Sequence, residues 1–288
     1  MPKNSNELSM RGSPDLSYPA LPLKLKSPRG FCWSLVGEQW RGAAERLERF
    51  FLPSTGTVDI QVLKQTFNRI VVRILPASDD LLPAVAKVFP MRSLRQYLYR
   101  WRRYAPSEAA KLLEAARRGL PVPAVYGLGL HRRWGLMRRS AVLMEDLAPL
   151  RPVGQLLRDS DGDAARQREI IMATVDVFVQ MHNVGCCNLD INKGSVFLSE
   201  DLKAPARVVD FQYAWFVEEP DDEGLAYQAA HFSAWCLPEV SPGLTAEWAA
   251  ALMERASVAD KADWWRLYTQ HASYPLTRRE RMKLRAMK

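Results

Sequence analysis

Several short stretches in the first half of the chain carry the β-branched residues and turn boundaries that favour β-strands. Residues 58–63 and 70–75 are rich in Val and Ile and flank a polar turn, so they are predicted to form a hairpin. Residues 83–89 predict a third strand, and residues 122–130 and 139–144 predict two more. The first half is therefore expected to be rich in β-structure.

Helical periodicity is sparse in this first half and dominates the second. Residues 38–51 predict one helix, and residues 107–118 predict another that ends where Gly and Pro follow. Residues 153–157 and 164–182 predict further helices, and the chain beyond residue 223 is helical and rich in Trp. Short strands are expected between these helical stretches.

The pattern divides the chain into three parts. Residues 1–30 contain five Pro among Ser and single charges, which predicts a flexible tail. Residues 31–147 form the expected β-rich lobe, and residues 148–288 form the expected helical lobe. The predicted fold class is α+β, with two lobes and a cleft between them.

Composition is that of a globular protein, with 48% hydrophobic and 25% charged residues among 288. No stretch has the roughly 20 apolar residues that cross a bilayer, and the N-terminus has no apolar signal segment. Four cysteines, at 32, 186, 187 and 236, are too few and too scattered for a disulfide framework or a zinc site. A cytoplasmic location is expected.

The chain carries 40 Lys and Arg against 32 acidic residues, a formal charge of +8 that favours an anionic partner. The positive charge is concentrated in three clusters: Arg92, Arg95, Arg100, Arg102 and Arg103; Arg132, Arg133, Arg138 and Arg139; and residues 278–285. Solvated helix faces and loop tips are the alternative interpretation of each. No nucleic-acid-binding motif accompanies the charge, so no nucleic-acid partner is expected.

Two carboxylates about 20 residues apart are the strongest candidates for chemistry. Asp190 lies in a loop before a short apolar strand, and Asp210 follows the next predicted strand. Two such groups suit phosphoryl transfer, because one can accept the proton of an attacking hydroxyl while the other holds Mg²⁺ on ATP.

A lysine in an apolar strand adds to this set. Lys87 lies between Ala86 and Val88, where a cation is costly without a partner. Glu108 or Glu114 on the following helix could be that partner; alternatively, Lys87 extends from an edge strand into solvent. Lys, Glu, Asp and Asp in this order form the constellation of a kinase.

With these residues the chain resembles the lipopolysaccharide core kinases, the Kdo/heptose kinase group of protein-kinase-like enzymes. The resemblance extends from about residue 58 to the basic C-terminus, and no single motif carries it alone. Its carriers are residues 63–73 and 86–89, Pro106 to Lys111, Arg118 to Pro123, Met144 to Leu147, the Asp190 loop and Val209 to Phe211.

The resemblance implies a bilobal protein-kinase-like fold and a role for each candidate. Lys87 would contact the α- and β-phosphates, and Glu108 would orient it. Asp190 would be the catalytic base, and Asp210 would bind Mg²⁺. The backbone of Met144, Glu145 and Asp146 would hold the adenine edge.

The catalytic loop departs from the family pattern at two positions. Asn188 stands where His is common, and Ser195 stands where a second Mg²⁺ ligand, His or Asn, is usual. Ser195 is then the candidate second ligand, with Asn192 as an alternative from a neighbouring position. The hairpin turn at residues 65–69 contains no Gly, so its backbone cannot approach phosphates as a Gly-rich loop does.

The resemblance therefore favours an ATP- and Mg²⁺-dependent sugar kinase acting on the inner core of lipopolysaccharide, with heptose preferred over Kdo. Its partners would be a lipid-linked core oligosaccharide and the anionic surface of the inner membrane, to which the basic clusters would attach it peripherally from the cytoplasm. The alternative is a catalytically impaired, kinase-like binding or scaffold protein, which the departures at Asn188 and Ser195 motivate. A small-molecule kinase of the aminoglycoside or choline type is less favoured, because those enzymes usually carry His-x-Asp and an Asn five residues later.

Overall fold

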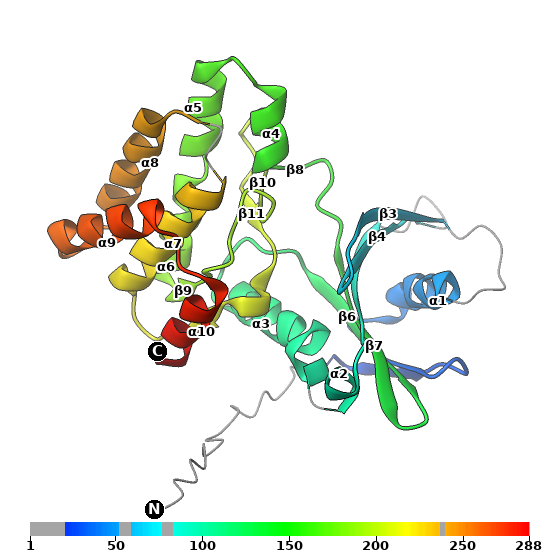
Figure 1. The fold of residues 1–288 in the computed structure, drawn as a ribbon. Helices are drawn as coiled ribbons and strands as arrows, with labels where there is room; N and C mark the ends of the chain where they lie inside the picture. Colours follow the sequence, from blue (N-terminus) through cyan, green and yellow to red (C-terminus); the bar gives the residue numbers. More distant parts are fainter. Residues whose placement is uncertain (1–20, 52–58, 77–82, 99, 237–239, 288) are drawn as a thin grey trace, which may run out of the picture.

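A computed structural model describes residues 21–51, 59–76, 83–98, 100–236 and 240–287. A seven-stranded antiparallel sheet dominates the first part of the chain, and helices dominate the second part (Figure 1). This arrangement confirms the α+β fold class expected from the sequence.

The sheet has the strand order β1-β2-β6-β7-β5-β4-β3. Its strands are β1 (Leu23–Lys26), β2 (Phe31–Leu35), β3 (Ile60–Gln65), β4 (Ile70–Ile74), β5 (Ala84–Pro90), β6 (Val125–Arg133) and β7 (Leu136–Glu145). The helices of this part are the 3-10 helix η1 (Glu38–Trp40), α1 (Arg41–Phe50), α2 (Leu94–Leu98), the 3-10 helix η2 (Arg100–Arg103) and α3 (Ala105–Arg117).

The two faces of this sheet are covered by different helices because side chains alternate along each strand. Val72 of β4 and Ala86 and Val88 of β5 are buried on one face, in the cluster that contains Leu47 of α1. Lys87, between the last two, therefore points to the opposite face, where α3 lies (Figure 1). The alternation within β5 thus directs a lysine toward the second part of the molecule.

The second part is built mainly from helices. They are α4 (Val153–Asp159), α5 (Ala164–Met172), α6 (Val175–Asn183), α7 (Asp222–Cys236), α8 (Pro242–Arg255), α9 (Lys261–Ser273) and α10 (Arg278–Met287). Short strands and one 3-10 helix connect them: β8 (Arg151–Pro152), β9 (Cys186–Cys187), β10 (Val196–Leu198), β11 (Arg207–Val208), η3 (Phe211–Tyr213) and β12 (Trp215–Phe216). The boundary expected after residue 147 lies between β7 and β8, and its role as a domain boundary stays a prediction.

The single helix predicted over residues 164–182 is wrong, because the chain forms α5 and α6 with a break between them. Thr174, which is fully buried, lies at this break. Its Oγ1 donates to the Ile171 carbonyl (2.7 Å) and accepts from Nε1 of Trp248 (2.9 Å). A threonine hydroxyl that bonds back to the preceding turn competes with the helical hydrogen bonds, and this bonding accounts for the break.

The flexible tail predicted over residues 1–30 is also too long. Residues 23–26 form β1 and pair with β2, although residues 1–20 lie outside the described residues. Glu48 of α1 anchors this region: its Oε1 accepts from Nε1 of Trp33 at 2.7 Å, and its Oε2 accepts from the hydroxyl of Ser27. The Pro residues in this segment favoured the prediction of a tail. The strand β1 was not predicted because its pairing depends on partners elsewhere in the chain.

Replacing Glu48 with Ala is expected to destabilise the protein by about 1–3 kcal/mol, because the buried indole N–H of Trp33 loses its acceptor. The matched control is Glu45→Ala, an exposed glutamate on the same helix, whose effect should stay within about 0.5 kcal/mol. Urea unfolding midpoints measure both. Equal midpoints for the two variants would show that Glu48 does not anchor this region.

Candidate active site

A cavity of about 840 Å³ is lined by residues from both parts of the chain. Strands β4 and β5 contribute Val71 and Lys87, and α3 contributes Glu108. The end of β7, the linker that follows it and the loops around β10 and β11 contribute residues 144–150, 192–195 and 209–210. Among the candidate site residues, Asp190 and the alternative glutamate Glu114 do not line this cavity.

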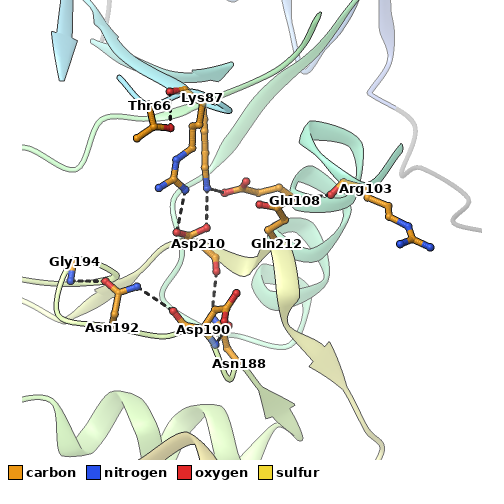
Figure 2. Close-up of polar contacts among 11 residues, drawn as sticks. Thr66, Lys87, Arg103, Glu108, Asn188, Asp190, Asn192, Gly194, Asp210 and Gln212 are labelled. Atoms are coloured by element: carbon orange, nitrogen blue, oxygen red, sulfur yellow. Dashed lines mark hydrogen bonds and ion pairs between the residues drawn. The ribbon is translucent and has the colours of Figure 1, made fainter. Parts of the chain in front are cut away.

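The ammonium group of Lys87 lies between two carboxylates (Figure 2). Its Nζ is 2.6 Å from Oε1 of Glu108 and 2.9 Å from Oδ1 of Asp210. The side chains of Lys87 and Glu108 are 7% and 1% exposed, so the alternative in which Lys87 extends into solvent is wrong. The pair of Lys87 and Glu108 is a buried ion pair that joins β5 to α3.

The structure also decides between the two glutamates of α3. Glu114 binds Arg117 and Arg118, with N–O distances of 2.6 and 2.7 Å, on the more exposed part of the helix. Glu108 points at Lys87 instead. Sequence spacing alone left this choice open.

The charges of the cluster shift its protonation equilibria. Burial lowers the pKa of Lys87, but the carboxylates of Glu108 and Asp210 outweigh it and raise this pKa above its usual value. Burial likewise opposes ionisation of Asp210, whereas Lys87 and Arg69 hold its pKa below the usual range. Lys87 is therefore a cation and Asp210 an anion at neutral pH.

Arg69 is a site residue that the sequence analysis did not identify. It lies in the turn between β3 and β4, and its Nη1 is 3.2 Å from Oδ2 of Asp210. The turn without Gly thus reaches the site through a side chain rather than through its backbone. The only feature of the sequence that could have identified Arg69 is its place as a basic residue in a turn next to the predicted cleft.

Asp210 lies two residues after β11 and has a left-handed backbone conformation, with φ of +70°. Asp is among the few residues other than Gly that adopt this conformation readily. Asn188 stabilises the turn, because its Nδ2 donates to the Asp210 carbonyl at 3.2 Å (Figure 2). Asn188 is buried, and its own N–H donates to Oε1 of Gln228 at 2.7 Å. The residue that departs from the family pattern thus ties the Asp190 loop to the Asp210 loop.

The loop after Asp190 is closed by the amide of Asn192 (Figure 2). Its Nδ2 donates to the Asp190 carbonyl at 3.0 Å, and its Oδ1 accepts from the N–H of Gly194 at 2.9 Å. Ser195 is 1% exposed, and its backbone bonds both Asn192 and Val209. The amide of Asn192 is therefore engaged in holding the loop, and Ser195 as a metal ligand stays a prediction.

The side chain of Asp190 is held by the C-terminal helix. Arg281 of α10 places Nη2 and Nε at 2.9 and 3.1 Å from Oδ1 of Asp190. Nη1 of the same arginine donates to the Leu276 carbonyl at 2.7 Å, which fixes the guanidinium. In the sequence, Arg281 stands out only as part of a basic cluster, because no local pattern connects it to a loop 91 positions away.

The linker residues proposed for adenine binding are themselves held in place. Glu145 accepts from Nη2 of Arg207 at 2.9 Å. Asp146 accepts from Nη2 of Arg73 at 3.2 Å, within an ion pair whose shortest N–O distance is 2.6 Å. The Glu145 N–H donates to the Ala124 carbonyl at 2.9 Å. That N–H is therefore engaged within the protein, while the linker as a whole, from Met144 onward, lines the cavity.

The donor set fits Mg²⁺ when it is shared with a nucleotide. Among the described residues, no group of three or more His, Cys, Asp or Glu is arranged to bind a metal ion alone. Asp210 and Ser195 offer a carboxylate and a hydroxyl on one cavity wall, and Mg²⁺ usually takes one or two carboxylates plus phosphate oxygens. The residues fit a phosphate-bound Mg²⁺, which would compensate phosphate charge there.

The family model for the lipopolysaccharide kinase (Kdo/WaaP) family matches residues 91–215. The resemblance to the lipopolysaccharide core kinases is confirmed. The match includes Glu108, the linker, Asp190, Ser195 and Asp210, while Lys87 lies just before it. This similarity to a kinase family over residues 91–215 supports a phosphotransferase activity.

A solved structure titled "WaaP in complex with acyl carrier protein" is similar to this chain. The TM-score is 0.53 at 15% sequence identity, and the alignment covers 75% of this chain and 89% of that one. At this identity the similarity concerns the fold, and it confirms the bilobal kinase-like architecture. None of the curated proteins matches the chain.

The docking of α10 beside the Asp190 loop can be tested through the pKa of a nearby histidine, His231. Burial and, to a lesser extent, the charge of Arg281 lower the pKa of His231 on α7 to about 4. In Arg281→Gln this pKa should rise toward its ordinary value, as measured by NMR titration of the imidazole resonance. The control Arg279→Gln, an exposed neighbour on α10, should leave it unchanged. Identical titrations of the two variants would argue against docking of α10 in solution.

Proposed function

We propose that the protein is an ATP-dependent kinase that phosphorylates a sugar of the lipopolysaccharide inner core. The observation that carries the proposal is the buried cluster of Lys87, Glu108 and Asp210 at a cavity shared by the two parts of the chain. The preference for heptose over Kdo rests on the sequence resemblance alone.

Lys87 and Glu108 would prepare the cavity for the phosphates of ATP. The ammonium of Lys87 would contact the α- and β-phosphates, while Glu108 holds that ammonium from its buried side. Asp210 and Ser195 would be the protein ligands of Mg²⁺, and Mg²⁺ would supply compensation of phosphate charge. Nζ of Lys87 and Nη1 of Arg69, which bond Asp210 here, would remain close enough to contact phosphate oxygens. The backbone of Met144, Glu145 and Asp146 would border the adenine.

Asp190 would act as the base. The described contacts engage Oδ1 of its carboxylate, through Arg281, and leave Oδ2 for the acceptor hydroxyl. In the transfer, a bond forms between the acceptor oxygen and the γ-phosphorus, and the bond from that phosphorus to the β–γ bridging oxygen breaks. The hydroxyl proton passes to Asp190, and ADP leaves with its negative charge partly compensated by Lys87.

The acceptor would be a lipid-linked core oligosaccharide, reached from the cytoplasmic side of the inner membrane. None of the helices within the described residues has the length and apolar character needed to cross a membrane. Peripheral attachment through the net positive charge would bring the cavity to its substrate, since each Lys or Arg near an anionic surface contributes about 1 kcal/mol.

A catalytically impaired, kinase-like binding or scaffold protein is the second candidate. Two observations favour it: Ser195 stands at the position of the second metal ligand, and Arg281 occupies one oxygen of Asp190. Such a protein would bind nucleotide or core oligosaccharide without turnover. The two candidates differ in whether phosphate is transferred.

In Asp190→Asn the turnover number should fall by about 10²–10⁴, because the hydroxyl proton has no acceptor of sufficient basicity. The assay follows phosphate from γ-labelled ATP into dephosphorylated core lipopolysaccharide. Asp159→Asn, on an exposed carboxylate paired with Arg151, is the matched control and should transfer phosphate like the wild type. Transfer by Asp190→Asn at the wild-type rate would refute Asp190 as the base. Binding of Mg-ATP by the wild type without any transfer would support the scaffold candidate.

Two conservative substitutions on α3 test the partner of Lys87. Glu108→Gln should lower kcat/KM for ATP by at least about tenfold, because a buried bond to a charged group is worth about 1.5–3 kcal/mol. Glu114→Gln makes the same chemical change on the same helix and should leave kcat/KM near the wild-type value. Circular dichroism verifies that both variants are folded. Equal losses in the two variants would contradict the specific role of Glu108.

A further inference from the structure

A second cavity lies at the end of the sheet next to the turn between β6 and β7. Its volume is about 470 Å³, and it shares no lining residue with the candidate active site. Its lining residues are Phe51, Ile70, Pro90, Met91, Arg92, Tyr97, His131, Arg133, Arg138 and Arg139. We refer to this cavity as the arginine pocket.

Four of the ten lining residues are arginines, one is a histidine and none is acidic. Two of the basic clusters of the sequence meet here: Arg92 comes from the first, and Arg133, Arg138 and Arg139 come from the second. The active-site cleft does not use any of these side chains. The folded chain thus concentrates positive charge at a place where no lining carboxylate compensates it.

The guanidinium groups are held by aromatic rings. The distances from the guanidinium carbon to the ring centroid are 4.6 Å for Arg92 and Phe67, 4.5 Å for Arg133 and Trp134, 4.9 Å for Arg138 and Tyr97, and 4.9 Å for Arg139 and Phe51. Stacking fixes the plane of a guanidinium and leaves its N–H edge available for an oxyanion. Nε of Arg138 is buried and has no hydrogen-bond partner among the described residues.

The uncompensated charge affects the histidine in the same pocket. Burial, followed by the charges of Arg139, Arg133 and Arg138, lowers the pKa of His131 below its ordinary value. Burial also lowers the pKa of Arg139. Like charges held together at a partly buried site are unfavourable, and a bound anion would relieve this repulsion.

We propose that the arginine pocket binds the phosphate group of a ligand. Guanidinium groups bind phosphate through paired N–H···O bonds, and arginine is the side chain best matched to that geometry. The cavity has room for a phosphate and the small group esterified to it. This site is independent of the kinase chemistry proposed for the cleft, and its test requires no turnover.

Two exposed aromatic residues next to the pocket favour a lipid headgroup as the source of the phosphate. Trp134 is 79% exposed in the turn between β6 and β7, and Phe67 is 70% exposed in the turn between β3 and β4. Each is bound to a pocket arginine: Arg133 stacks on Trp134, and Nε of Arg92 donates to the Phe67 carbonyl at 2.7 Å. Exposed aromatic rings beside cations are typical of surfaces that contact the headgroup region of a bilayer. A soluble phosphate ester is the other source of the same chemistry.

The experiment uses the imidazole resonance of His131 in the full-length protein as a local probe. Inorganic phosphate should raise the pKa of His131 toward its ordinary value, because an anion offsets the three neighbouring arginines. A parallel arm measures cosedimentation with vesicles of phosphatidylcholine, with and without phosphatidylglycerol. Because the probe lies in the pocket, phosphate bound at the Lys87 cleft does not affect it directly.

The test variant is Arg138→Gln/Arg139→Gln, and the matched control is Arg255→Gln/Arg266→Gln. The control removes the same charge from two exposed arginines on α8 and α9. The test variant should lower the affinity for inorganic phosphate at least about tenfold, while the control keeps the wild-type affinity. Should the test variant fail to fold, Arg92→Gln, at an exposed pocket residue, should also weaken the response of His131.

The outcomes separate the sources of phosphate. Loss of binding to phosphatidylglycerol vesicles in the test variant alone would identify a lipid headgroup. A response of His131 to inorganic phosphate, with vesicle binding equal in the test and control variants, would identify a soluble phosphate ester. The proposal is overturned if neither probe binds the wild type, or if the test variant binds both probes as the wild type does.

Discussion

The buried ammonium of Lys87 is the constraint on which the arrangement of the two parts depends. It is held by Glu108 from α3 and by Asp210 from the loop after β11, so three distant segments meet at one charge. Removing one partner from a buried ion pair costs about 3–5 kcal/mol, since the remaining charge is left without compensation. The sheet, α3 and the Asp210 loop are therefore coupled through a single side chain.

Ion pairs, and hydrogen bonds from side-chain amides, hold the rest of the cleft in position around this centre. Arg69 and Arg281 each engage one of the two aspartates, from positions 141 and 91 residues away in the chain. Asn188 and Asn192 connect the loops by hydrogen bonds to backbone carbonyls. A candidate active site held in this way would have its carboxylates in place before a substrate binds, which would reduce the entropy lost in reaching the reactive geometry.

The arginines of the chain fall into two groups that differ in their partners. Arg73 in the cleft and Arg281 beside the Asp190 loop have carboxylate partners and set geometry. The arginines of the arginine pocket lie against aromatic rings instead, and no carboxylate lines that pocket. A net charge of +8 does not distinguish these groups, because only the partner of each guanidinium decides whether it can bind a ligand.

Local sequence patterns predicted the fold class, the strands around Lys87 and the order of Lys, Glu, Asp and Asp, because side-chain periodicity and motif spacing are local properties. Two predictions from local patterns were wrong. The buried hydroxyl of Thr174 divides a predicted helix, and the buried carboxylate of Glu48 anchors part of a predicted tail. The choice of Glu108, the contact of Arg281 with Asp190 and the meeting of two basic clusters in one pocket were decided by tertiary structure alone. Each of these contacts depends on segments that folding brings together. Charge–charge contacts between distant segments produce no periodic pattern in the sequence from which they could be predicted.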